Sequence, residues 1–387
     1  MKKIMFRPVS DFFHAIDNEW AIDKEVDLRL YGNEISTVFR PLKTRKYISQ
    51  TRFSAFFYPV FLWGLFFLIP VYFIFSLLKI TFFILFRESK SASGLQRKNV
   101  VLDFNNRTAG LVDKVKGGGL EYVVINNVLS DKKSSILNYI DFIDCIQAFF
   151  LSIVSFFLSI FKRSPISCRF NVIFSFYWFL TYLSMKRLRT DSSIGSVYYS
   201  NHYDRWACLI DSVFMGEDLC LLQHGLLPKN LNLPFPPKNF SKLWCFGESS
   251  RQDFERIFKG LDGVDINFYV DSLDLKRVES DLFTILIVGQ PQSSVKEVNL
   301  VKLISDRRSD IKIFLKPHPV FGNKIYETVS KCLILDKAFF PMVDIVVCED
   351  STLGYEYDCC GVPVIWWADK TVETVFDEIV EYMRINQ

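Results

Sequence analysis

His318 is the residue of this 387-residue chain whose surroundings most clearly indicate chemistry. It lies in the segment Lys316-Pro317-His318-Pro319, directly after the apolar run 311–315. Two prolines restrict the backbone on either side of the imidazole, so the ring is held in a fixed direction. An imidazole and an ammonium group suit phosphate oxygens, which bind directed donors and positive charge. We therefore expect Lys316, His318 and Pro319 to belong to a phosphate-binding loop.

A second segment, 344–367, predicts a strand, a turn and a helix. Ser351 and Thr352 stand where the helix should begin. A hydroxyl there caps the helix, and the free N–H groups of the first turn favour a phosphate. Glu356 follows about one turn later, where its carboxylate would either accept hydrogen bonds from ribose hydroxyls or face solvent. We expect all three residues at a nucleotide site.

A polar turn at 289–294 follows the apolar run 283–288, and a nucleotide would lie beside it. Gln290 and Ser293 are the expected contacts. The turn has neither the glycine spacing of a dinucleotide-binding loop nor that of a P-loop, and the chain has no Gly-x-Ser-x-Gly elbow. Dehydrogenases, P-loop nucleotide hydrolases and α/β-hydrolases therefore lose support.

His224 and Gly225 follow the apolar run 218–223. Glycine permits a sharp turn and close backbone approach. Imidazole titrates near neutral pH, so His224 is the expected general base for an attacking hydroxyl. The alternative is a histidine that is simply hydrogen-bonded at a strand end.

The segment 200–206 closes another apolar run and is dense in polar groups. His202 and Asp204 are the rival candidates for the catalytic base. Arg205 would bind a phosphate or an acidic acceptor.

The elements that carry these residues alternate between apolar strands and helices, which is typical of parallel α/β sheets. Ligands of such sheets bind at the carboxyl ends of the strands. The polar segment 271–281 marks a boundary. We predict two doubly wound domains, one at 98–275 for the acceptor and one at 276–387 for the donor, preceded by an N-terminal region at 1–97.

The apolar segment 53–86 indicates membrane contact, because no charged residue occurs from Phe53 to Leu78 and about 20 residues cross a bilayer core. Basic residues flank both ends, which favours the cytoplasmic face of the plasma membrane. A single span, a re-entrant hairpin and an in-plane helix all stay open. The apolar stretches 136–161 and 170–185 are either surface-lying helices or helices packed on a sheet, and two aspartates make the first a less favoured span.

Charge and cysteine usage exclude other classes. The 46 basic and 43 acidic residues give a net charge of +3, too small to indicate nucleic-acid binding. The nine cysteines form no Cys-x-x-Cys pair, which indicates reduced thiols and no zinc site. No Asp-x-Asp motif is present, so we expect neither a metal nor a cofactor beyond the donor itself.

Three motifs in order resemble those of a superfamily of bacterial GT-B enzymes: Gln-His-Gly at 223–225, Lys-Pro-His-Pro at 316–319 and Ser-Thr at 351–352, followed by Gly-Val-Pro-Val-Ile-Trp-Trp. The superfamily includes CDP-glycerol glycerophosphotransferases, polysialyltransferases and capsule-type transferases. The resemblance covers about residues 196–367. It implies two Rossmann-type domains, a donor phosphate held by the second and third motifs, and a base in the first. Polysialyltransferases carry an acidic motif in place of the first.

The resemblance implies a metal-independent glycosyltransferase of surface polysaccharide (capsule or O-antigen) synthesis. It would move a sugar from a nucleotide-activated donor, of CMP, CDP or UDP type, to a lipid-linked glycan at the membrane. One alternative is a CDP-glycerol-type polyol-phosphate transferase of teichoic-acid-like polymers. Another is a non-catalytic membrane scaffold of a polysaccharide assembly complex.

Overall fold

The computed structural model describes most of the chain in two compact units, Met1–Tyr269 and Val270–Gln387. The described residues are 7–31, 64, 66–85, 98–126, 134–162, 169, 171–191, 194–214, 218–227, 231–269, 273–290, 293–318, 325–329, 331–336, 338–349 and 351–386.

The first unit contains a six-stranded sheet in the order β2-β1-β3-β4-β5-β6, and every pair of neighbours is parallel. The strands are β1 (Asn99–Leu102), β2 (Tyr122–Ile125), β3 (Val197–Tyr199), β4 (Leu219–Leu222), β5 (Lys242–Cys245) and β6 (Asp265–Phe268). The middle strands β3 and β4 are buried throughout, as continuous apolar runs covered on both faces should be. The order reverses direction at β1, so the carboxyl ends of β1 and β3 form a switch point.

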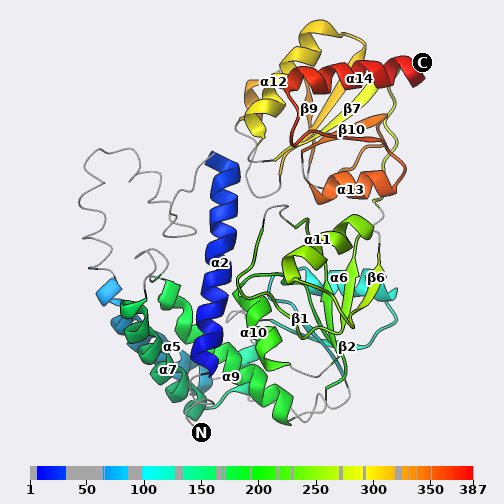
Figure 1. The fold of residues 1–387 in the computed structure, drawn as a ribbon. Helices are drawn as coiled ribbons and strands as arrows, with labels where there is room; N and C mark the ends of the chain where they lie inside the picture. Colours follow the sequence, from blue (N-terminus) through cyan, green and yellow to red (C-terminus); the bar gives the residue numbers. More distant parts are fainter. Residues whose placement is uncertain are drawn as a thin grey trace. The chain divides into compact units, whose positions relative to one another are not determined.

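Helices cover both faces of this sheet (Figure 1). The helices of this unit are α2 (Arg7–Tyr31), α5 (Ile69–Leu85), α6 (Thr108–Lys116), α7 (Phe142–Phe161), α9 (Ser175–Asp191), α10 (Arg205–Val213) and α11 (Glu248–Phe258), with 3-10 turns η2 (Ile136–Tyr139) and η3 (Asn171–Phe174). Of these, α5 and α7 pack on each other, and α7 packs on α9. Phe12, Phe73, Phe179 and Tyr199 belong to one continuous core. The described parts of region 1–97 therefore pack with the sheet, and the chain divides after Tyr269.

Among the described residues, α7 is the one helix that is long and apolar enough to cross a membrane, judged by length and composition alone. The two aspartates in this stretch lie at its start. Asp141 caps the helix by accepting from the Asp144 amide, and Asp144 accepts in return from the Asp141 amide. Arg187 pairs with both. Of the predicted segment 53–86, residues 53–63, 65 and 86 lie outside the described residues, and α5 covers 17 of the rest.

The second unit contains a five-stranded parallel sheet in the order β11-β10-β7-β8-β9. Its strands are β7 (Phe283–Val288), β8 (Ile311–Lys316), β9 (Leu333–Ile334), β10 (Ile345–Cys348) and β11 (Val364–Trp366), and its helices are α12 (Ser294–Arg307), the turn η4 (Tyr326–Thr328), α13 (Thr352–Cys359) and α14 (Val372–Asn386). One face packs on α12 and α14, and the other packs on α13 (Figure 1). The prediction of two α/β units with parallel sheets is confirmed.

Candidate functional site

The carboxyl ends of β1, β3 and β4 bring three polar segments together in the first unit. Ser200, directly after β3, bonds to two residues that follow β1: its hydroxyl lies 2.8 Å from Thr108 Oγ1 and accepts from Asn105 Nδ2 at 2.9 Å. The sequence analysis missed Asn105 and Thr108. The signal was present, because a polar run follows the strand at Leu102.

His202 links the ends of β3 and β4. Its ring lies 4.4 Å from the ring of His224, and its Nε2 lies 3.1 Å from the His224 amide nitrogen and 3.2 Å from the Leu222 carbonyl oxygen. Burial, together with the neighbouring His224, holds the pKa of His202 well below its ordinary value. His202 is therefore a neutral, internally engaged ring, and its contacts fix the backbone of His224.

His224 has the free atom that a base requires. Its Nδ1 is buried and accepts no hydrogen bond from the part of the chain that the structure describes. Burial and the positive charge of Arg107 together lower the pKa of His224 to about 4, against the opposing effect of a backbone hydrogen bond at Ser200. The imidazole is therefore neutral near pH 7 with an unprotonated nitrogen, but at a pKa of about 4 it is a weaker base than the ordinary imidazole that the sequence predicts.

The turn around His224 is held by its neighbours. The Gln223 side chain donates to the Gly225 carbonyl at 3.0 Å and accepts from the Phe246 amide at 2.9 Å. A Cβ built on Gly225 would meet no described atom within 4 Å, and the φ of Gly225 is outside the left-handed region. Neither the backbone conformation nor the described surroundings of Gly225 require a glycine at this position.

Asp204 and Arg205 are occupied by structural contacts. Asp204 caps α10 by accepting from the Trp206 and Ala207 amides at 3.0 Å each, and its other oxygen accepts from Asn201 at 2.6 Å. Burial raises its pKa, although these hydrogen bonds oppose the shift.

The Arg205 guanidinium forms a two-point ion pair with Glu19 of α2 and lies 4.1 Å over the Phe174 ring. Because the Asp204 carboxylate is occupied by Asn201 and by the cap of α10, we favour His224 over Asp204 as the base. The contacts of Arg205 leave it engaged with a carboxylate rather than with a ligand.

In the second unit, the loop after β7 is organised by a buried carboxylate that the sequence analysis missed. Glu297 is fully buried, and its Oε1 accepts from the Gln290 amide at 2.8 Å and from Ser293 Oγ at 2.6 Å. Tyr326 donates to its other oxygen. The predicted donor contacts Gln290 and Ser293 therefore use these groups internally. Gly289 is required here, because a Cβ would lie 2.9 Å from the Tyr326 hydroxyl.

Burial raises the pKa of Glu297 to about 7, with Glu349 adding to the rise and three hydrogen bonds opposing it. The native state thus binds a proton that the unfolded chain releases between pH 4.5 and 7, so this side chain costs stability as pH rises through that window. Glu297→Gln keeps the acceptor and loses the charge. We expect the free energy of unfolding of the variant, relative to wild type, to rise by about 1–3 kcal/mol from pH 5 to pH 8 in urea titrations. An unchanged difference at the two pH values would contradict the assignment.

Lys316, at the end of β8, points to main-chain oxygens. Its ammonium donates to the Asp336 carbonyl at 2.9 Å and to the Phe339 carbonyl at 2.8 Å, and it lies 4.2 Å over the Phe340 ring. Burial lowers its pKa. These contacts make it a structural support of the segment that follows β9. His318 lies two residues further and is half-buried, and Pro319 lies outside the described residues.

Ser351 caps α13, as the sequence predicts: its hydroxyl accepts from the Leu353 amide at 3.3 Å. Thr352 begins the helix, and Glu356 lies about one turn further, half-buried. Gly354 lets the helix start approach the sheet, because a Cβ there would lie 2.7 Å from Trp366 and 3.0 Å from Cys348 Sγ. The first turn of α13 is therefore held close to the carboxyl end of β10.

Glu349 is a second residue to which sequence reasoning gave no role. It follows β10 at the position beside Gly289, since Val288 pairs with Cys348 in the sheet. Its Oε2 is buried and has no hydrogen-bond partner among the described residues. A buried carboxylate oxygen without a donor is costly, so this position favours a ligand that supplies one.

Comparisons with known proteins give distant likenesses. No family model matches the chain, and no curated protein matches it. Among solved structures, it is similar to the wall teichoic acid polymerase TagF at 11% identity, covering 75% of this chain and 73% of that one, with a TM-score of 0.38. MurG of Acinetobacter baumannii gives 11% identity over 74% and 90%, with a TM-score of 0.39. A UDP-forming trehalose-phosphate synthase of Burkholderia xenovorans gives 10% over 68% and 81%, with a TM-score of 0.37. Scores this low leave the function to be argued from the residues of this chain.

Proposed function

We propose that the chain is a GT-B glycosyltransferase that moves a sugar from a nucleotide-activated donor to a lipid-linked glycan in bacterial surface polysaccharide synthesis. The observation that carries the proposal is His224. Its buried Nδ1 accepts no hydrogen bond from the described residues, its imidazole is neutral near pH 7, and it follows β4 at the carboxyl end of the sheet. A neutral imidazole nitrogen without a hydrogen-bond partner among the described residues is what a general base for a hydroxyl nucleophile requires.

In the proposed reaction, an acceptor hydroxyl oxygen forms a bond to the anomeric carbon of the donor sugar. The bond from that carbon to the donor phosphate breaks, and its electron pair leaves with the nucleotide. The hydroxyl proton goes to His224. Negative charge grows on the leaving phosphate, and His318 with the first turn of α13 would stabilise it, because helix N-terminal amides favour phosphate.

Four acidic and hydroxyl side chains would complete the donor site. Ser351 holds the helix start in place, and Thr352 would offer its hydroxyl to the phosphate. Glu349 would accept a hydrogen bond from a ribose hydroxyl or a base amino group with its unpartnered oxygen. Glu356 would serve a second ribose hydroxyl.

The proposal is tested by a nucleotide-binding screen followed by product analysis. Purified protein is titrated with CMP, CDP, UDP, GDP and TDP, and the preferred donor class is then offered with a lipid-linked acceptor. Glycosidic products support the proposal, and phosphodiester products by phosphorus NMR would instead identify a polyol-phosphate transferase. Absence of nucleotide binding, with polymer synthesis surviving loss of His224 in cells, would identify a scaffold.

The membrane part of the proposal is supported by α5 and α7, which pack on each other and expose large apolar side chains. Phe75 of α5 is 66% exposed, and Phe150 of α7 is 63% exposed. The apolar face comprises Phe67, Leu68, Val71, Tyr72, Ile74, Phe75, Leu78, Phe82, Leu85, Phe142, Ile143, Ile146, Phe150, Val154, Phe157, Leu158 and Phe161. A soluble monomer rarely exposes so large a contiguous apolar set.

The inner sides of these two helices carry small and polar residues. Ser152, Ser155 and Ser159 of α7 and Ser76 of α5 are buried. On α7 these small residues face inward and large apolar residues face outward, which is a pattern of helices packed in lipid. The buried side of α5 is mostly large and apolar, with Ile69, Phe73 and Ile80 beside Ser76. The exposed Lys79 in the middle of α5 disfavours a full crossing by that helix, since a charge at the bilayer centre costs about 2.5–3.5 kcal/mol. We propose that the apolar face of α5 and α7 rests in one leaflet.

Charges on the apolar face should detach the protein from membranes. For the double variant Phe150→Lys and Phe157→Lys, we expect binding to vesicles of phosphatidylglycerol and phosphatidylcholine to fall at least tenfold in sedimentation assays. Phe268→Lys is the matched control, because Phe268 is 52% exposed on β6, outside the apolar face. Equal vesicle binding by the double variant and wild type would overturn the membrane assignment.

A further inference from the structure

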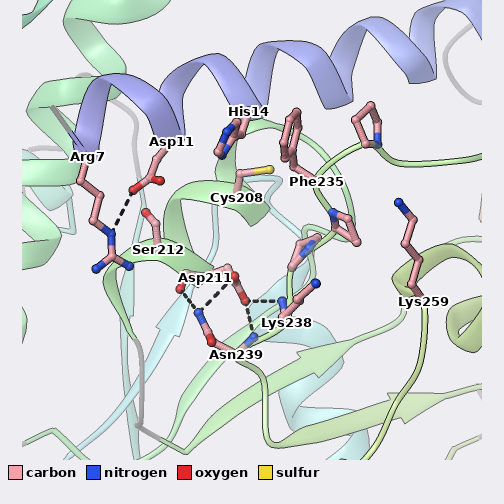
Figure 2. Close-up of a pocket in the computed structure, with 13 residues that line it drawn as sticks. Arg7, Asp11, His14, Cys208, Asp211, Ser212, Phe235, Lys238, Asn239 and Lys259 are labelled. Carbon is pink, nitrogen blue, oxygen red and sulfur yellow. Dashed lines mark hydrogen bonds and ion pairs between the residues drawn. The ribbon is translucent and has the colours of Figure 1, made fainter. Parts of the chain in front are cut away.

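A cavity of about 280 Å³ lies in the first unit between the start of α2, the end of α10 and the segment 234–239 (Figure 2). Asp211 and Ser212, in the last turn of α10, line it. The first turn of α10 stands at the carboxyl end of β3, so the cavity lies toward the opposite end of the sheet from His224. The proposed transfer reaction gives this cavity no role.

The wall of the cavity is built and rigid. Pro234, Pro236 and Pro237 restrict the backbone of one side. The Asn18 side chain fixes the backbone of Phe235, which lies between Pro234 and Pro236. It accepts from the Phe235 amide at 2.9 Å and donates to the Phe235 carbonyl at 2.6 Å. A preorganised wall lowers the entropic cost of binding a ligand.

Asp211 fixes the next part of the segment. Its Oδ1 accepts from the amides of Lys238 and Asn239 at 2.8 and 2.6 Å, and the Asn239 side chain donates to its Oδ2 at 3.2 Å. Burial raises the pKa of Asp211 to about 6, opposed by these amides and with Asp11 adding to the rise. These amides occupy both carboxylate oxygens of Asp211, and Lys238 partly offsets its negative charge, so Lys259 is the cation least engaged by this carboxylate.

Three cations surround the cavity. Figure 2 shows Arg7 at one end and Lys259 at the other, with Lys238 between them. Lys238 and Lys259 are exposed, and neither makes an ion pair with another described residue. Lys259 holds a left-handed backbone with φ of 59°, which places this side chain at the end of α11. The three cations favour a ligand that carries negative charge.

The cavity also offers an acceptor and a flat surface. Asp11 Oδ2 is buried, lies 3.8 Å from Arg7 Nε and accepts no hydrogen bond from the described residues. Burial raises the pKa of Asp11, although the neighbouring Arg7 and His14 oppose the shift. Beside it the His14 ring stacks on Phe235, with centroids 3.8 Å apart and planes 15° apart. Phe235 is 41% exposed, so it presents an apolar surface.

We propose that this cavity binds one anionic sugar unit, carboxylated or phosphorylated, at a site separate from the transfer site. The ring would pack its C–H groups on Phe235, a hydroxyl would donate to Asp11, and the anionic group would face Lys238 and Lys259. A volume of about 280 Å³ is at the small end for ligand pockets and fits one unit rather than a nucleotide sugar. The unit would come from an acidic polysaccharide chain or from a free sugar phosphate.

Direct titration of the full-length protein tests this site without reference to transfer activity. The probes are methyl glucuronide, glucose 6-phosphate and methyl glucoside, measured by calorimetry at low and at physiological salt. We expect at least one anionic probe to bind tenfold or more tightly than the neutral glucoside, and its affinity to fall with salt. Tighter binding of the glucuronide indicates a chain unit as the source, and tighter binding of the phosphate indicates a free sugar phosphate. Equal binding of all three probes, or of none, would overturn the proposal.

Substitutions of the lining lysines test whether the anionic probe binds at this cavity. Lys238→Ala with Lys259→Ala should weaken the anionic probe about tenfold, whereas Lys296→Ala, an exposed lysine of the second unit, should leave it unchanged. His318→Ala should also leave it unchanged, which separates this site from the donor site. If the lysine double variant binds as wild type does, the site is elsewhere and the inference fails. Unaltered thermal unfolding of the double variant confirms that its fold is intact.

Discussion

Replacing His224 with glutamine is expected to lower turnover about 10²- to 10⁴-fold, the usual contribution of a positioned general base. Glutamine fills similar space beside His202 but accepts no proton at neutral pH. Because the rings of His224 and His202 lie 4.4 Å apart and Nδ1 of His224 has no described partner, the replacement breaks no described side-chain hydrogen bond at that atom. Nucleotide release in the presence of acceptor measures the loss. Gln252→Ala, on the exposed side of α11, is the control.

The pH dependence of stability gives an independent check on His224. Its pKa of about 4 lies below the ordinary 6.5, so the unfolded chain binds more protons than the native state between these values. The contribution of this group to stability is therefore complete above about pH 6.5 and is lost as pH falls toward 4. His224→Gln should be less sensitive to acid over that range than wild type. Full turnover in His224→Gln would instead show that His224 is not the catalytic base.

The second large effect is expected on donor affinity in His318→Ala. Loss of a hydrogen bond to a charged phosphate costs about 1.5–3 kcal/mol, which corresponds to about 10- to 100-fold weaker binding of the nucleotide. Calorimetric titration with the nucleotide selected by the binding screen measures it. Asn299→Ala, exposed on α12, is the control within the same unit.

Lys316→Ala separates structural from ligand roles in the same segment. Because the ammonium of Lys316 holds the carbonyls of Asp336 and Phe339, its loss should lower the melting temperature of the protein. The loss in His318→Ala should appear in affinity without a comparable fall in melting temperature. Unchanged affinity in His318→Ala would refute the phosphate role of this histidine.

Local pattern predicted the elements better than it predicted the contacts. The capping of α13 by Ser351 depends on residues within one turn, and the structure has it as predicted. The expected separation of region 1–97 from the sheet is not visible in the packing, because Phe12 and Phe73 share a core with Tyr199.

The sequence by itself determined the two parallel α/β units and the placement of polar residues at strand ends, because apolar runs and turn residues are local and periodic. Tertiary structure alone decided which of those polar groups are already occupied. Glu19 pairs with Arg205 across 186 positions of the chain, and Asp336 holds Lys316 from 20 residues away. No local pattern encodes such partners, since they depend on which elements pack together. The same packing left Nδ1 of His224 buried and without a hydrogen-bond partner among the described residues.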